Sequence, residues 1–275
     1  MRFVEHRIGD KRVVRLIRRW LAAGVLEEGV WTRSETGTPQ GGSISPVLAN
    51  VYMHYVFDLW AQRWRKTAAR GEVIIVRYLD DFIVGFQHRS DAEGFAKVLR
   101  ERLEQYGLQL HSDKTRLMEF GRYAAQNRRE RGQGKPETFQ FLGFVHSSGR
   151  TRTGSFVVRR QTAGQRVRAK LKDVSQELRR RWHAPIPEVG GWLAAVVRGH
   201  CQYYGIVGNA RAIRRFREAV CRLWQRALGR RSQKSQVSWA RMQRLERRWI
   251  PPARIVHPSS SVTFAVMTRG RSPVR

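Results

Sequence analysis

The sequence predicts an α+β protein, in which a mixed half with helices and short antiparallel strands precedes an all-α, strongly basic half. In the first half, short apolar runs rich in β-branched residues flank a pair of acids, as in a β-hairpin. After about residue 162, apolar residues recur at helical spacing on segments rich in arginine. These two patterns assign the two halves to different kinds of structure.

Two helices are expected before the acid pair. The first follows Asp10, a good N-cap, and Gly24 ends its apolar stripe. The second begins with Ser45 as N-cap and Pro46 as first helical residue, and runs to about Trp64. Its expected buried side is formed by Leu48, Val51, Tyr52, Tyr55, Leu59 and Trp60.

The acid pair, Asp80 and Asp81, lies between two apolar runs, residues 73–76 and 82–86. The pair is therefore predicted at the tip of a β-hairpin, where two like charges repel each other. Carboxylates are preferred ligands of Mg²⁺, and paired metal ions stabilise the oxygens of phosphoryl transfer. Adjacent acids are also common in solvated turns, so these residues alone leave both interpretations open.

Further elements follow the hairpin. Residues 90–93 form a capping-box pattern that opens an amphipathic helix, which Gly107 closes. Residues 121–137 are basic and polar and receive no assignment, whereas residues 139–144 alternate like a strand that enters a tight turn. Three helices are then expected, with Val167 to Leu178 in the first, Trp192 to Tyr204 in the second, and the third after Asn209.

Charge is distributed unevenly along the chain. The net charge is +31, and residues 150–275 carry 29 Lys and Arg against 5 Asp and Glu. Such an excess indicates a polyanionic partner, and the interleaved aromatic residues favour nucleic acid over membrane. The basic residues proposed to bind RNA are Arg166, Lys170, Arg211, Arg214, Arg215 and Arg222.

Composition also excludes several classes of protein. The two cysteines form neither a disulfide framework nor a zinc pattern. No run of 18 apolar residues is present, and the N-terminus lacks a signal-peptide pattern. We therefore expect a soluble, cytoplasmic protein without a membrane segment.

Four motifs occur in an order that resembles the later palm motifs of reverse transcriptases: residues 38–42 (TPQGG), 78–81 (YLDD), Lys114, and 141–144 (FLGF). Residues 45–50, 190–192, 203–204 and 252–258 resemble the group II intron-encoded branch of that family, whose members combine reverse transcriptase and maturase regions. The resemblance covers nearly the whole chain. It implies a partial palm over residues 1–160, a helical thumb or maturase region over 161–249, and an extended basic tail over 250–275.

The resemblance also implies roles for individual residues. Asp80 would be a metal ligand and Asp81 a second ligand or its support, in a two-Mg²⁺ site for nucleotidyl transfer. Lys114 would act near the leaving pyrophosphate as a cation or general acid, although a solvated surface lysine fits its spacing equally well. The residues expected to contact substrate, primer or template are Gln40, Gly41, Gly42, Tyr78, Phe141, Leu142 and Gly143.

Two departures from the family pattern bear on activity. Leu79 stands where this branch usually has Ala, beside the expected metal site. The sequence starts with a stretch that resembles the region after the first catalytic strand, so the fingers and the other metal-binding Asp are expected to be absent. Asp10, Asp58 and Asp113 lack the context to replace that residue. We expect little polymerase activity from this chain alone.

Three hypotheses follow from the sequence. The first is an RNA-directed DNA polymerase that acts on an RNA/DNA primer-template. Its missing Asp is expected either from a separate N-terminal reverse transcriptase fragment or from the full-length protein of which this sequence is a truncated form. The second is a non-catalytic splicing factor of maturase type that binds group II intron RNA through the basic half. The third is a decayed gene fragment, for which an exposed sheet edge would be an aggregation hazard.

Overall fold

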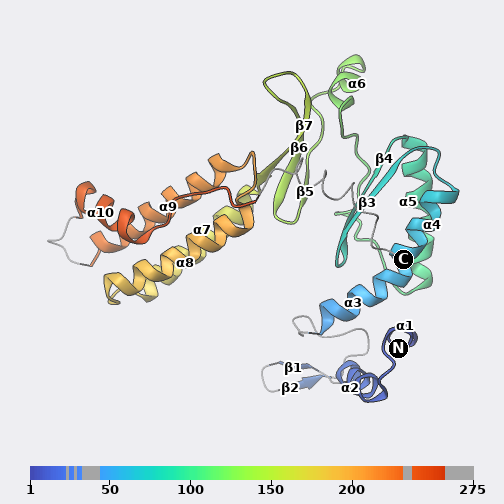
Figure 1. The fold of residues 1–275 in the computed structure, drawn as a ribbon, viewed down its shortest axis with the longest axis horizontal. Helices are drawn as coiled ribbons and strands as arrows, with labels where there is room; N and C mark the ends of the chain where they lie inside the picture. The colour runs from blue at the N-terminus through green and yellow to red at the C-terminus, as the bar shows by residue number, and fades with distance from the viewer. Residues whose placement is uncertain (23–24, 28–29, 33–43, 232–236, 258–275) are drawn as a thin grey trace. The chain divides into compact units, whose positions relative to one another are not determined.

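The computed structural model describes residues 1–22, 25–27, 30–32, 44–231 and 237–257. The chain divides into two compact units, Met1–Met118 and Glu119–Arg275, and each is described here by itself. Both contain helices and small antiparallel sheets, so the coarse α+β prediction is confirmed (Figure 1). No helix in the described ranges combines the length and apolar composition that a bilayer span requires.

In its described residues the first unit consists of helices and two antiparallel two-stranded sheets. Asp10 caps the second helix as predicted, since its carboxylate accepts a hydrogen bond of 2.8 Å from the backbone N–H of Arg12. The elements of this unit are α1 (Arg2–Arg7), α2 (Lys11–Ala22), β1 (Val25–Glu27), β2 (Val30–Thr32), α3 (Ser45–Met53), the π-helical turn η1 (His54–Asp58), α4 (Leu59–Thr67), β3 (Val73–Tyr78), β4 (Asp81–Phe86) and α5 (Arg89–Gln105).

The predicted helix after Ser45 exists, but a π-helical turn interrupts its phase. Helices α3 and α4 continue through η1 without a break, and Ile44 rather than Ser45 is the N-cap. A π turn takes up more residues than an α turn, so the side chains beyond it rotate relative to a regular helix. Val56 and Phe57 are fully buried, whereas Leu59, expected inside, is 50% exposed.

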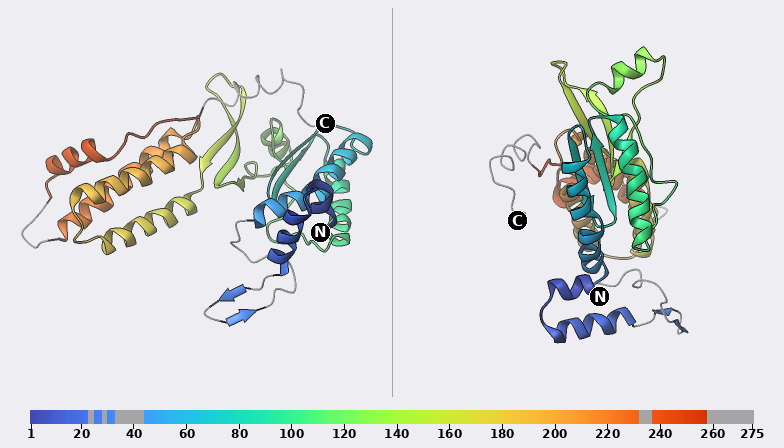
Figure 2. Two further views of the ribbon diagram at one scale, coloured as in Figure 1. Left: turned by 60° about the horizontal axis from the view of Figure 1, so that its bottom comes forward. Right: turned by 90° about the vertical axis from the view of Figure 1, so that its right-hand side faces the viewer.

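The β3–β4 hairpin is antiparallel, as predicted, and is paired from Val73 opposite Phe86 to Tyr78 opposite Asp81. One face of the hairpin packs on η1, α4 and α5, as the right-hand view of Figure 2 shows. Side chains Ile74, Val76 and Tyr78 project from the other face and are exposed within this unit. The buried core under the hairpin consists of Met53, Val56, Phe57, Ala61, Phe95, Leu99 and Leu103.

Helix α5 begins two residues earlier than its capping-box pattern predicts, with His88 in place of Ser90 as N-cap and without a side-chain cap. The carboxylate of Asp91 is buried and instead accepts hydrogen bonds from the backbone N–H groups of Arg70 and Gly71, at 2.9 and 3.0 Å. Asp91 therefore holds the turn between α4 and β3. Gly107 ends this helical region with φ 68°, as predicted.

The second unit joins a three-stranded sheet to a group of helices. The predicted strand before residue 142 pairs with β6, and β6 also pairs with β7, which the sequence patterns did not reveal. Helices α6 and α10 were also not predicted. The elements are α6 (Ala124–Glu130), β5 (Phe139–Phe141), β6 (Phe144–Arg150), β7 (Phe156–Thr162), α7 (Gly164–Arg180), α8 (Ile186–Tyr204), α9 (Ala210–Gly229) and α10 (Trp239–Trp249).

The helices α7 to α10 enclose a continuous apolar core. Three of them follow the predicted segments, and Figures 1 and 2 show α7, α8 and α9 running side by side. Residues 250–257 then return along the bundle without helix or strand, and the N–H of Val256 donates to the carbonyl of Gly205 at 2.8 Å. The fully buried members of the core include Leu193, Val197, Phe216, Val220, Trp224 and Met242.

Candidate functional site

The acid pair lies at the turn of the β3–β4 hairpin. Tyr78 pairs with Asp81, so Leu79 and Asp80 form a two-residue turn. Leu79 has φ 58°, and Asp80 has no positive φ. A positive φ at the first central residue alone is typical of a type II′ turn, in which glycine is favoured at that position. A leucine there costs about 1–2 kcal/mol, so other contacts have to hold the turn.

Both carboxylates of the pair are exposed, and neither has a hydrogen bond or an ion pair within the described part of the chain. Two adjacent negative charges of this kind favour a bound cation. The described residues contain no group of three or more Asp, Glu, His or Cys that could share a metal ion. Two carboxylates are a donor set that suits Mg²⁺, which is often held by one or two carboxylates together with substrate phosphates.

Arg77 connects this turn to the long helix behind it. Its Nε and Nη2 donate to the two carboxylate oxygens of Asp58, both at 2.7 Å. Its Nη1 donates to the side chain of Asn50 at 2.9 Å and to the carbonyl oxygen of Leu79 at 2.7 Å. The hydrogen bonds to Asp58 raise the pKa of the Arg77 guanidinium.

Asp58 was predicted to lack the context of a replacement metal ligand, and Arg77 and Asn50 were not predicted as site residues. The structure gives Asp58 a different partner, the guanidinium of Arg77. The basic residue next to the YLDD motif was a usable signal, because an arginine inside a half-buried strand needs acceptors. Its partner was not visible in the sequence, because Asp58 lies at the end of the π-helical turn.

The other residues that the sequence predicts for this site fall into three cases. Tyr78 is on β3 and 57% exposed. Lys114 is exposed in a turn after α5, and within the described residues no contact joins it to Asp80 or Asp81. Gln40, Gly41 and Gly42 lie outside the described residues.

The FLGF motif forms the turn between β5 and β6. Phe141 pairs with Phe144, and the two central residues, Leu142 and Gly143, have φ 48° and 76°. Positive φ at both positions is typical of a type I′ turn. The hydroxyl of Tyr203, at the end of α8, donates to the carbonyl oxygen of Leu142 at 3.0 Å.

A buried asparagine fixes the neighbouring chain segments, and the sequence patterns indicated it only as the residue before α9. The side chain of Asn209 accepts from the N–H of Thr162 at 3.1 Å and donates to the hydroxyl of Thr162 at 2.7 Å. It also donates to the carbonyl of Tyr204 at 2.8 Å. Asn209 therefore ties the end of β7 to the connection between α8 and α9.

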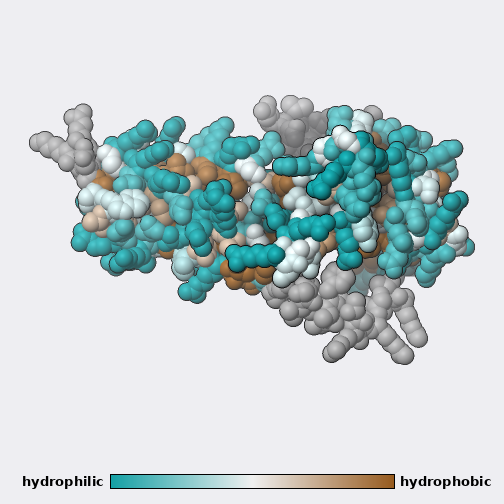
Figure 3. Space-filling model, turned by 90° about the horizontal axis from the view of Figure 1, so that it is seen from above, coloured by the Kyte–Doolittle hydropathy of each residue, from teal (hydrophilic) through white to brown (hydrophobic). Residues whose placement is uncertain are grey.

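The basic candidates of the second unit are all exposed. On α9 the four arginines are spaced by three, one and seven residues, so they follow one stripe of the helix; on α7 the two basic residues are four apart. No ion pair links any of the six to a carboxylate in the described ranges. Figure 3 shows one face of the molecule, on which hydrophilic side chains predominate and hydrophobic ones form small patches. The six are Arg166, Lys170, Arg211, Arg214, Arg215 and Arg222.

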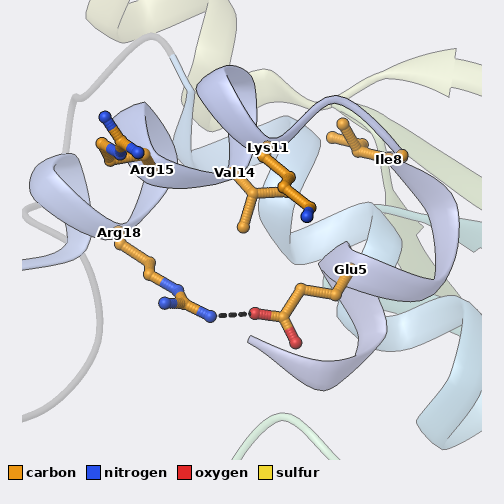
Figure 4. Close-up of a pocket in the computed structure, with 7 residues that line it drawn as sticks. Glu5, Ile8, Lys11, Val14, Arg15 and Arg18 are labelled. Carbon is orange, nitrogen blue, oxygen red and sulfur yellow. Dashed lines mark hydrogen bonds and ion pairs between the residues drawn. The ribbon is translucent and has the colours of Figure 1, made fainter.

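An open pocket of about 450 Å³ lies between α1 and α2 and contains none of these candidates. Figure 4 shows Glu5 and Arg18 facing each other there, joined by an ion pair. Because this ion pair uses Arg18, two cations of the lining remain without a carboxylate partner among the described residues. The lining residues are Glu5, Ile8, Gly9, Lys11, Val14, Arg15 and Arg18.

Comparison with known proteins gives consistent matches. The family model of reverse transcriptase (RNA-dependent DNA polymerase) matches residues 4–146. Protein YkfC of Escherichia coli K12 is 31% identical over 144 residues, which cover 42% of this chain and 38% of that protein. The group II intron-encoded protein LtrA of Lactococcus lactis subsp. cremoris is 34% identical over 128 residues, covering 43% of this chain and 21% of that protein.

A shorter match is to an uncharacterized 91 kDa protein in the cob intron of Schizosaccharomyces pombe, 48% identical over 48 residues, which cover 18% of this chain and 6% of that protein. The chain thus spans less than two fifths of the length of the curated relatives it matches. The stretch matched by the family model contains the acid pair, Lys114 and the FLGF turn.

Proposed function

Because the chain belongs to the reverse transcriptase family, we propose that it forms part of the catalytic centre of an RNA-directed DNA polymerase of group II intron type. The observation that carries this proposal is the strained hairpin turn that presents two exposed carboxylates, Asp80 and Asp81, which have no ion-pair partner among the described residues. The reaction is the attack of a primer 3′-hydroxyl on the α-phosphorus of a deoxynucleotide, with release of pyrophosphate. Magnesium, when bound at the pair, would stabilise the developing charge on the phosphoryl oxygens.

The residues of the chain have distinct roles in this proposal. Asp80 binds the metal and Asp81 is a second ligand or supports the first, while Lys114 acts near the leaving pyrophosphate as a cation or general acid. The turn at Leu142 and Gly143 supports the primer strand, and Gln40 to Gly42 lie along the forming base pair. Residues 1–160 act as palm, residues 161–249 as thumb, and residues 250–275 as a basic tail.

A complete two-metal site needs a further carboxylate. The described residues offer no third ligand near the pair, and Asp58 is engaged by Arg77. Loss of about 4 kcal/mol of transition-state stabilisation lowers a rate roughly 10³-fold. We therefore propose that the chain alone extends primers weakly and that a separate N-terminal reverse transcriptase segment increases the rate.

Primer extension on an RNA template tests this function. The unmodified chain is compared with Asp80→Asn, with and without an added N-terminal reverse transcriptase segment. Glu101→Gln is the matched control, because Glu101 is an exposed carboxylate on α5 of the same unit. We expect Asp80→Asn to abolish magnesium-dependent extension and Glu101→Gln to retain it. If no extension occurs even with the added segment, the polymerase proposal fails.

A second candidate function is binding of group II intron RNA without catalysis. It is supported by the basic stripe on α9 and by the two basic residues on α7, which have no carboxylate partners within the described residues. Filter binding of a structured intron RNA at increasing salt tests it, since phosphate contacts make affinity fall with salt. Salt-dependent RNA binding together with a complete lack of extension would favour this function over the polymerase.

A further inference from the structure

We propose that Arg77 is a positioning residue for the acid pair: held by Asp58, it fixes the carbonyl of Leu79 and thereby the turn that presents Asp80 and Asp81. The inference rests on the proposed function of that turn. Arg77 would touch neither metal nor substrate. It would act through the backbone conformation of the residue that precedes the ligand.

The contacts of Arg77 form a bridge between two separate elements. Asp58 takes two hydrogen bonds of equal length in the fork geometry that arginine forms with a carboxylate. The remaining terminal nitrogen reaches the turn and donates to the carbonyl of Leu79 at 2.7 Å. The Arg77 side chain is only 13% exposed, so these contacts are formed largely away from water.

The turn needs such support because of its residue type. Leu79 lies in the left-handed region with φ 58°, where side chains other than glycine are disfavoured. Strained conformations of this kind persist where the surrounding structure over-determines them. A charged donor on the carbonyl of the strained residue itself provides that restraint.

The position of Asp58 also has a structural origin. Asp58 is the last residue of the π-helical turn η1, and π turns are frequent at functional sites. The same turn is held from α1, because Arg7 donates to the ring nitrogen of His54 at 2.8 Å and to the hydroxyl of Tyr55 at 3.1 Å. The contacts therefore continue from α1 through η1 and Arg77 to the turn.

An ordinary structural ion pair is the alternative, and glycine distinguishes the two roles. If Arg77 acts by holding Leu79 at positive φ, Leu79→Gly should compensate for Arg77→Lys, because glycine adopts that conformation without a steric penalty. Lysine keeps the positive charge, but it lacks the planar guanidinium that donates to Asp58, Asn50 and Leu79 at the same time. A role in stability alone gives no reason for this compensation at the turn.

The test uses the full chain with Arg77→Lys, Asp58→Asn, Leu79→Gly and the double variant of Arg77 and Leu79. Amide hydrogen exchange over residues 78–82 reports the turn, and electron paramagnetic resonance reports Mn²⁺ affinity. We expect Arg77→Lys and Asp58→Asn to accelerate exchange at the turn and to weaken Mn²⁺ binding about 10-fold, as for other partners that orient metal ligands. The double variant should recover most of both losses.

Arg217 provides a matched control in the second unit. Its guanidinium pairs with Glu246 and donates to the carbonyls of Ile250 and Pro251, and its side chain is 19% exposed. Arg217→Lys should lower the melting temperature without changing exchange at the turn or Mn²⁺ affinity.

Two results would overturn the inference: exchange at the turn that is unchanged by Arg77→Lys, or a double variant as impaired as Arg77→Lys alone. Failure of the proposed function gives a different pattern. In that case the unmodified chain binds no Mn²⁺, or Asp80→Asn leaves its binding unchanged, and the exchange measurement still decides whether Arg77 holds the turn.

Discussion

The hydroxyl of Tyr203 donates a 3.0 Å hydrogen bond to the carbonyl oxygen of Leu142, joining the end of α8 to the turn between β5 and β6 across 61 residues of sequence. Leu142 and Leu79 are the two non-glycine residues with positive φ in the described part of the chain. In both turns a side chain donates to the carbonyl of the strained leucine. Two of the four motifs that carry the family resemblance, YLDD and FLGF, are thus held in the same way.

The FLGF turn should be sensitive to a single methyl group at Gly143. A Cβ there would lie 2.8 Å from the hydroxyl oxygen of Tyr204, whereas a Cβ at Gly154 would meet nothing within 4 Å. Both glycines have positive φ, so Gly154→Ala is a matched control for backbone strain alone, about 1–2 kcal/mol. Gly143→Ala should destabilise the second unit by more than Gly154→Ala, measured by urea unfolding. Adding Tyr204→Phe should remove the difference, and an unrelieved loss would contradict the contact.

Two adjacent glycines in α8 should respond in opposite directions. A Cβ at Gly190 would lie 2.6 Å from Cγ of Trp249, the last residue of α10, while one at Gly191 would meet nothing within 4 Å. We expect Gly190→Ala to cost about 1–3 kcal/mol by overpacking. Gly191→Ala should stabilise α8 by roughly 0.5–1 kcal/mol, because alanine loses less backbone freedom in a helix. Thermal unfolding measures both, and equal effects would argue against the packing of α10 on α8.

Acid should destabilise the second unit through His200. The ring of His200 stacks on Phe216 at 3.6 Å, and its buried Nε2 has no hydrogen-bond partner among the described residues. Burial, and secondarily the charge of Lys170, lowers the pKa of His200 from 6.5 to about 4. Between pH 6.5 and 4 the imidazole of His200 is therefore protonated in the unfolded chain and neutral in the folded one. The free energy of unfolding is highest above pH 6.5 and decreases by roughly 3 kcal/mol as the pH falls towards 4.

His200→Phe keeps the aromatic stacking and removes the proton, so it should flatten the melting temperature between pH 6.5 and 4. A smaller slope should remain from His146, whose pKa burial also lowers. His183→Gln is the control, since His183 is exposed. A slope that persists in full in His200→Phe would show that other groups govern acid unfolding.

The arginine stripe on α9 should contribute more to RNA binding than an equal number of exposed arginines elsewhere in the second unit. Changing Arg211, Arg214 and Arg215 together to Gln should weaken binding of structured RNA and reduce the salt slope of log affinity by about 2–3. The matched control changes three exposed arginines of α10, Arg241, Arg244 and Arg247, and so removes the same charge. Equal losses in the two triple variants would mean that RNA responds to net charge and not to this stripe.

The local patterns of the sequence determined much of this protein. Apolar runs on either side of Asp80 and Asp81 specify the hairpin, because strand and turn preferences act over a few residues. The helical spacing from Val167 onward likewise specifies α7, α8 and α9. The motifs were sufficient to identify the reverse transcriptase family, which the match over residues 4–146 confirms.

Tertiary structure decided the features that depend on residues far apart in the chain. The partner of Arg77 is 19 residues away, and the contacts of Asn209 with Thr162 span 47. The buried face of the helix that carries Asp58 shifts at a π-helical turn, and the 3.6-residue spacing of apolar residues does not predict such a shift. Local preferences therefore placed the acid pair on a turn. The hydrogen bonds that hold this strained turn come from elements that meet only when the chain has folded.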